Sequence, residues 1–312
     1  MGAIVPGWFW AHGEGISPEA VAEDLIASAK ASGMSVLHLP VPFSIENPLG
    51  TFSESEFRNL DYFLDSAARN GVYVMPVLMD GYGITEQPEF AYYNPGGFAG
   101  LIMDEKLAKA YRERIETFIS HRNTINGRLY RDDPTIFGWD IMAEPSGYPT
   151  SPVLTLPQIK AWFEETASYV KSLDANHLVG VNFNGSFDSQ YPGYWQTWYE
   201  VVGVPSLDFL EYEENAQPVV NPEDYVVYEW TPKILSLGKP IINLVVMPIY
   251  SSSEPTCTDN IWQANFIRAF ALRNYEAGVS GVSVTSWASD LAPWLPDFDL
   301  CIIKKRFNVA NS

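Results

Sequence analysis

The chain has 312 residues, of which 46% are hydrophobic and 18% are charged, and its formal net charge at pH 7 is −19. This composition is typical of a globular protein with a large buried core. The acidity argues against nucleic acid or an anionic membrane as a partner, because both require clustered Lys and Arg. No apolar run approaches the roughly 18 residues of a membrane-spanning helix, and residues 1–5 do not form a secretion signal.

Eight short apolar runs predict β-strands. In chain order they are Ala3–Trp10, Ser35–Val41, Tyr73–Met79, Ile136–Met142, Leu178–Phe183, Leu207–Tyr212, Pro240–Met247 and Gly281–Trp287. The segments between them have the spacing of apolar residues that predicts amphipathic helices. They are Pro18–Ser32 after the N-cap Ser17, Glu54–Asn70, Glu105–Arg122, Leu156–Leu173, Tyr194–Val202, Asp224–Leu237 and Asn260–Ala277.

This alternation predicts the α/β class, as a (β/α)8 TIM barrel in a single domain over residues 1–312. The alternative is a doubly wound open sheet, but no Gly-rich phosphate loop follows the first strand. In a barrel, chemistry takes place where strands end and the following loops begin. Glu144 holds such a position, in the run "GWDIMAEP" of residues 138–145.

Residues 111–145, "YRERIETFISHRNTINGRLYRDDPTIFGWDIMAEP", resemble family 5 glycoside hydrolases of clan A, especially the endo-β-1,4-mannanase branch. Other runs resemble the family in the same order, including "NLDYFLDSAARNGVYVMPVL", "GKPII" and "ALRNYEAGVSGVSVTSW". The resemblance covers most of the chain and implies a TIM barrel, in agreement with the strand count.

The family cleaves glycosidic bonds with two carboxylates, one as nucleophile and one as acid/base. The resemblance implies that Glu144 is the acid/base, but the chain departs from the family around it. Val245 stands where the family has its nucleophile, and Ala143 stands where the family has the Asn before the acid/base. His38 replaces an Arg, Glu213 replaces a His and Asn215 replaces a Tyr. Because valine has no lone pair to attack a sugar, the retaining mechanism cannot run on this set.

We therefore expect catalysis to depend on Glu144 and Glu213, with Glu213 as the only replacement that supplies a second carboxylate. The surrounding strand ends predict a substrate-binding set that includes rings suited to stacking on flat ligands. Its members are Trp10, His38, Ala143, Asn215, Val245 and Trp287.

Three functions remain open. In the first, a carboxylate in an apolar pocket acts as a general base on a flat organic substrate, as in a Kemp eliminase. In the second, Glu144 and Glu213 retain some β-mannanase or β-glycanase activity, which would be inverting if they stood well apart. In the third, the barrel binds mannan or glucan chains without cutting them. The residues leave open whether the altered mouth is natural or designed.

No cofactor or metal is expected, because the histidines show no ligand spacing, although His12 and His38 with carboxylates provide a zinc alternative. A disulfide between Cys257 and Cys301 is also left open. We expect a monomer whose partner is a small molecule or oligosaccharide in the barrel mouth. The family resemblance implies a secreted parent, but no signal peptide is visible, so the location is left open.

Overall fold

The computed structural model describes residues 2–4, 17–41, 45–46, 48–81, 97–145, 154–184, 194–215, 229–246 and 259–284. Within these ranges the strands form a closed parallel barrel in chain order, with β1 also paired to β8. The strands are β1 (Gly2–Ile4), β2 (Val36–Pro40), β3 (Tyr73–Val77), β4 (Gly138–Ala143), β5 (Leu178–Asn184), β6 (Phe209–Asn215), β7 (Ile241–Val246) and β8 (Gly281–Val284). The predicted (β/α)8 fold is confirmed.

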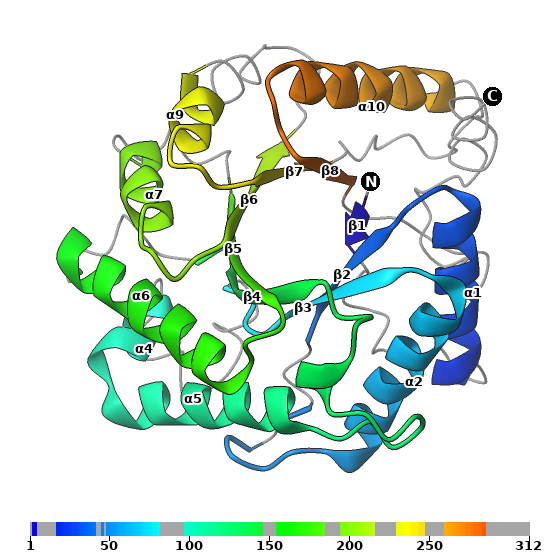
Figure 1. Ribbon diagram of the computed structural model, residues 1–312, viewed down its shortest axis with the longest axis vertical. Coiled ribbons are helices and arrows are strands. Elements are labelled where there is room, and N and C mark those ends of the chain that lie inside the picture. The colour runs from blue at the N-terminus through cyan, green and yellow to red at the C-terminus, as the bar shows by residue number, and fades with distance from the viewer. Residues whose placement is uncertain are drawn as a thin grey trace.

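Helices surround the ring of strands, as Figure 1 shows. They are α1 (Pro18–Ala31), α2 (Glu54–Asn70), α4 (Gly97–Met103), α5 (Glu105–Ser120), α6 (Leu156–Leu173), α7 (Tyr194–Val202), α9 (Thr231–Leu235) and α10 (Asp259–Glu276). The sequence did not predict α4. Of the predicted helix Asp224–Leu237, the described part is helical over residues 229–235, which include α9, and residues 216–228 lie outside the described ranges. Across the described ranges, every helix is too short or too polar to cross a membrane.

Side-chain caps fix where several helices begin. Ser17 accepts a hydrogen bond from the Ala20 amide, as predicted, and Ser53 accepts one from the Glu56 amide. Asp104 accepts from two amides at the start of α5. These caps satisfy amides that would otherwise have no partner at a helix start.

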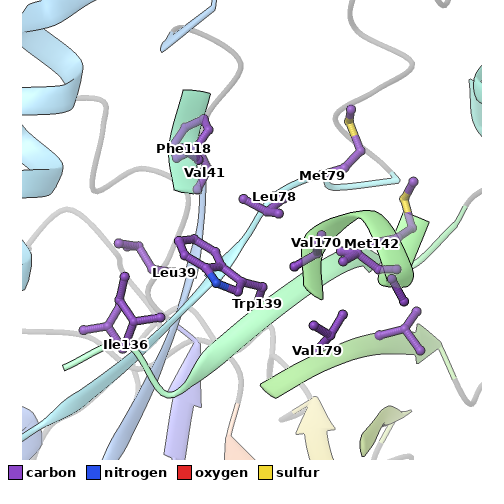
Figure 2. Packing of buried hydrophobic residues seen from close by; sticks show 14 of the residues in the cluster. Leu39, Val41, Leu78, Met79, Phe118, Ile136, Trp139, Met142, Val170 and Val179 are labelled. Carbon is purple, nitrogen blue, oxygen red and sulfur yellow. The ribbon is translucent and has the colours of Figure 1, made fainter. Parts of the chain in front are cut away.

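The main apolar core lies between the barrel and the helices. Apolar side chains on the outer face of the strands pack there against the apolar stripes of the helices. Figure 2 shows part of this packing, in which Phe118 of α5 and Val170 of α6 lie near strand residues such as Trp139. The inside of the barrel is different, because much of its middle is polar.

Candidate active site

Two carboxyl side chains meet at the C-terminal end of the barrel. Glu213 lies near the end of β6, Glu144 directly follows β4, and their side chains are hydrogen-bonded to each other. Burial, followed by this hydrogen bond and the negative charge of Glu144, raises the pKa of Glu213 to about 10. At neutral pH Glu213 is therefore protonated and donates the hydrogen bond to Glu144.

The backbone of Glu144 is strained. Its φ of 45° is left-handed, and no other non-glycine residue in the described ranges has a positive φ. Its amide donates to the Asn182 carbonyl at 2.9 Å, while the Gly81 amide donates to the Ala143 carbonyl at 2.7 Å. A Cβ on Gly81 would lie 1.9 Å from the Glu144 carbonyl oxygen, so a larger residue there would force the two segments apart. Strain of this kind is concentrated at functional sites, where neighbouring structure holds it in place.

Deeper in the barrel, one layer of side chains is polar. His38, Asp140, Glu211 and Ser283 come from the alternate strands β2, β4, β6 and β8, and all are almost fully buried. His38 Nδ1 lies 3.0 Å from Glu211 Oε2, as an ion-pair contact rather than a well-aligned hydrogen bond, and His38 Nε2 is hydrogen-bonded to Ser283 Oγ at 3.1 Å. In most (β/α)8 barrels, branched apolar residues fill such layers.

The remaining contacts of this layer lie on β4 and β5. Asn182 Nδ2 donates to Glu211 Oε2 at 3.4 Å, and the Met142 amide donates to Asp140 Oδ1 at 3.0 Å. Burial and then the charge of Glu211 raise the pKa of Asp140 well above its ordinary value, although the Met142 amide opposes the shift. Burial therefore favours the protonated form of Asp140.

The structure brings some of the predicted site residues together. Glu144 and Glu213 are in contact, so the large separation considered for an inverting mechanism is not what the structure shows. His38 is 1% exposed and lies in the polar layer beneath the pair. Ala143 is half-buried, and its amide donates to the Met79 carbonyl at 2.9 Å.

For the other predicted residues, the structure gives either the strand register alone or no position. Val245 is in register with Glu214 of β6, and Asn215 is in register with Val246 of β7. No residue of β7 carries a carboxyl group. Trp10 and Trp287 lie outside the described residues, as do His12, Cys257 and Cys301.

The sequence reasoning missed Asp140, Glu211 and Ser283. A signal for Glu211 was present, because residues two apart on a strand face the same side and Glu213 was already predicted to face the mouth. Asp140 stands in the same run as Glu144. A full inside–outside assignment of each strand would have placed these side chains in the barrel.

The carboxyl groups are not arranged as metal ligands. Within the described ranges, no three His, Cys, Asp or Glu side chains are grouped so that they could hold a metal ion. The other two described histidines have structural contacts. His121 Nε2 lies 3.0 Å from Asp61 Oδ1, and His177 Nδ1 lies 2.7 Å from Asp174 Oδ2.

Comparison with known proteins finds relatives for part of the chain. Residues 82–212 match the family model "GH family 5 beta-mannosidase-like". The chain is 34% identical over 154 residues to mannan endo-1,4-beta-mannosidase 4 of Oryza sativa subsp. japonica, which covers 46% of this chain and 32% of that protein. It is 28% identical over 193 residues to mannan endo-1,4-beta-mannosidase 1 of Arabidopsis thaliana, and this match covers 55% of this chain and 43% of that protein.

Over this region the chain is similar to family 5 mannosidases and mannanases. The resemblance predicted from its motifs is thereby confirmed. This mannanase-like chain also has the fold of the endo-beta-1,4-mannanase from Thermotoga petrophila, with a TM-score of 0.75 and 19% identity, covering 100% of this chain and 77% of that one. The family 5 mannosidase from Rhizomucor miehei gives a TM-score of 0.73 at 19% identity, covering 99% and 92%. Matches to the two curated relatives span a third to under half of their length.

Proposed function

We propose that this mannanase-like barrel is a proton-transfer catalyst rather than an efficient glycosidase. Glu144 acts as the general base, and Glu213 holds the single proton that the pair shares. The observation that carries the proposal is the direct hydrogen bond between the two carboxyl groups, one of which is kept neutral by burial.

The same contact argues against hydrolysis of a glycoside. A retaining enzyme holds its two carboxyl groups about 5–5.5 Å apart and an inverting enzyme about 6.5–9.5 Å apart, because a sugar carbon or a water must fit between them. Two groups that share a hydrogen bond leave no such space. In addition, the family's nucleophile position is Val245, and β7 has no carboxylate to replace it.

The chemistry that fits this pair is removal of a proton from an activated carbon of a flat organic molecule. With a benzisoxazole, Glu144 takes the ring C–H proton, the C–H electron pair completes a nitrile, and the N–O bond breaks to release a phenolate. The protonated Glu213 holds Glu144 in place through the hydrogen bond that it donates to it.

The test is the ring opening of 5-nitrobenzisoxazole by the wild type, Glu144→Gln and Glu213→Gln. We expect Glu144→Gln to lower kcat/KM by about 100-fold or more, the usual contribution of a general base. Glu213→Gln removes the shared proton but keeps a hydrogen-bond donor beside Glu144, so it should lower kcat/KM by less than Glu144→Gln does. Equal activity in wild type and Glu144→Gln would contradict the proposal.

A parallel assay on β-mannan distinguishes the alternative. Mannan hydrolysis that is lost in Glu144→Gln, without ring opening by the wild type, would overturn proton-transfer catalysis in favour of a residual glycosidase.

A second candidate function is binding of mannan-type oligosaccharides without cleavage. It is favoured by the similarity to mannan endo-1,4-beta-mannosidases, together with the missing nucleophile. Calorimetric binding of mannohexaose by a protein that is inactive in both assays would support this function and exclude the first.

A further inference from the structure

The polar layer inside the barrel is placed to act on the carboxyl pair above it. Glu211 and Glu213 are two residues apart on β6, so both side chains face the barrel interior. The register repeats this step on β5, where Asn182 is level with Glu211 and Asn184 is level with Glu213. Glu211 therefore lies one layer beneath the pair, on the same strand as its protonated member.

Glu211 is fully buried and is held from two sides. His38 Nδ1 of β2 lies 3.0 Å from its Oε2, and Asn182 Nδ2 of β5 donates to the same oxygen at 3.4 Å. His38 is itself hydrogen-bonded to Ser283 of β8, which fixes the ring from its other nitrogen. A buried carboxylate needs such partners, because desolvation otherwise drives it to take up a proton.

Some polar atoms of this layer have no hydrogen-bond partner among the residues that the structure describes. Within that part of the chain, Glu211 Oε1, Asp140 Oδ2 and Asn182 Oδ1 are buried and have no hydrogen-bond partner. Buried acceptors without partners are uncommon, and a catalytic role is one of the few reasons to keep them. An apolar layer of similar volume would avoid this cost.

The negative charges around the pair raise the pKa of Glu213 and of Asp140. Burial and the contact with Glu144 contribute most to the raised pKa of Glu213, followed by the charges of Asp80 and then Glu211. For Asp140, the charge of Glu211 is the largest contribution after burial, and Asp80 adds to it.

We propose that Glu211, clamped by His38, is a positioning residue that keeps the shared proton on Glu213 and leaves Glu144 as the carboxylate that receives the substrate proton. This inference rests on the proposed function of the pair. The groups that face Glu211 are His38 from β2, Asp140 from β4 and Asn182 from β5, with Glu213 above it on β6.

The test is a carbon-13 NMR titration of protein labelled at the glutamate carboxyl carbons, with the Glu213 signal assigned by its absence in Glu213→Gln. In Glu211→Gln, the amide keeps the size of the side chain but removes the charge. We expect the titration midpoint of Glu213 to fall, because a like charge that favours its protonated form is removed. Glu211→Asp, which retains the charge, should restore much of the shift.

Asp61→Asn is the matched control, because Asp61 is also a fully buried carboxylate beside a histidine, 3.0 Å from His121 Nε2, but takes no part in the carboxyl pair. It should leave the Glu213 midpoint unchanged. His38→Gln provides a second route in case Glu211→Gln does not fold. Without the 3.0 Å contact to His38, the Glu211 side chain is no longer held beneath the pair, so the Glu213 midpoint should again fall.

An unchanged or higher Glu213 midpoint in folded Glu211→Gln or His38→Gln would overturn the inference. The titration requires no turnover, so its outcome is separate from that of the ring-opening assay. If the midpoint falls as expected while the wild type opens no benzisoxazole, the role of Glu211 stands and the proposed function fails. If ring opening depends on Glu144 but the Glu213 midpoint does not move, the proposed function stands and the role of Glu211 fails.

Discussion

Glu213 makes the stability of the barrel depend on pH. Its ordinary pKa is 4.5 and burial beside Glu144 raises it to about 10 in the folded chain. The stabilisation linked to this raised pKa is fully present below pH 4.5, where both states hold the proton. As the pH rises toward 10, the unfolded chain releases the proton and the folded chain does not, so the free energy of unfolding falls.

Glu213→Gln should remove this dependence, because glutamine stays neutral at every pH. We expect the wild type to lose more thermal stability between pH 5 and pH 9 than the variant does. Calorimetric melting of both proteins across this range measures the difference. Parallel curves would show that Glu213 is not the buried acid that the structure describes.

The position of Glu144 could be predicted from sequence, but its contacts could not. The run that ends in Glu144 and Pro145 is a local pattern, and it identified the strand end. The hydrogen bond to Glu213 depends on a left-handed φ at Glu144 and on the close approach of Gly81. Both follow from how the segments after β3 and β4 fit together, which no local pattern encodes.

At the level of elements, α5 holds the ends of two strands through one side chain. Arg114 is buried and donates to the carbonyls of Leu78 at 2.8 Å and Val41 at 3.2 Å. Its Nη1 forms an ion pair with Glu46 at 3.1 Å, and Glu46 also accepts from the Gly50 amide at 2.8 Å. These contacts fix the backbone just before the segment that reaches Glu144.

Arg114→Met should therefore destabilise the barrel strongly, since it leaves the Glu46 carboxylate buried without its cation. We expect a loss of about 3–5 kcal/mol in the free energy of unfolding, measured by urea denaturation. Arg112→Met is the control on the same helix, because Arg112 is 60% exposed and its ion pair with Glu165 is 3.9 Å long. It should change the free energy by about 0.5 kcal/mol or less. Similar losses in both variants would contradict the role given to Arg114.

The elements themselves were largely predictable, with exceptions that have a physical cause. Helices such as α2 and α6 have strong apolar periodicity and begin and end where the sequence indicated. The short helix α4 follows no such signal, since its seven residues are mostly apolar and glycine. Its side chain Phe98 packs against Trp162 of α6, so tertiary contacts rather than periodicity stabilise it.

For the molecule as a whole, the net charge of −19 opposes the compact state through repulsion among like charges. Salt should weaken this repulsion, because the screening length falls from about 30 Å at 0.01 M to about 8 Å at 0.15 M. We expect the melting temperature at pH 7 to rise by a few degrees, on the order of 1 kcal/mol in stability, between these two conditions. Differential scanning calorimetry in NaCl, repeated in KCl to exclude a specific cation effect, measures the change. A lower melting temperature at higher salt would mean that surface ion pairs outweigh the repulsion.

The sequence by itself determined the fold class and the family resemblance, and it predicts that Val245 stands at the family's nucleophile position. Each of these follows from a local sequence pattern. The patterns are the alternating strand and helix periodicity, the motif before Glu144, and the valine five residues after Pro240. Tertiary structure alone decided that Glu144 and Glu213 share a hydrogen bond and that His38 and Glu211 form a buried pair beneath them. The reason is that these residues come from different strands of a closed barrel, so their distances and their shared protons are set by register and burial, which act only once the barrel has closed.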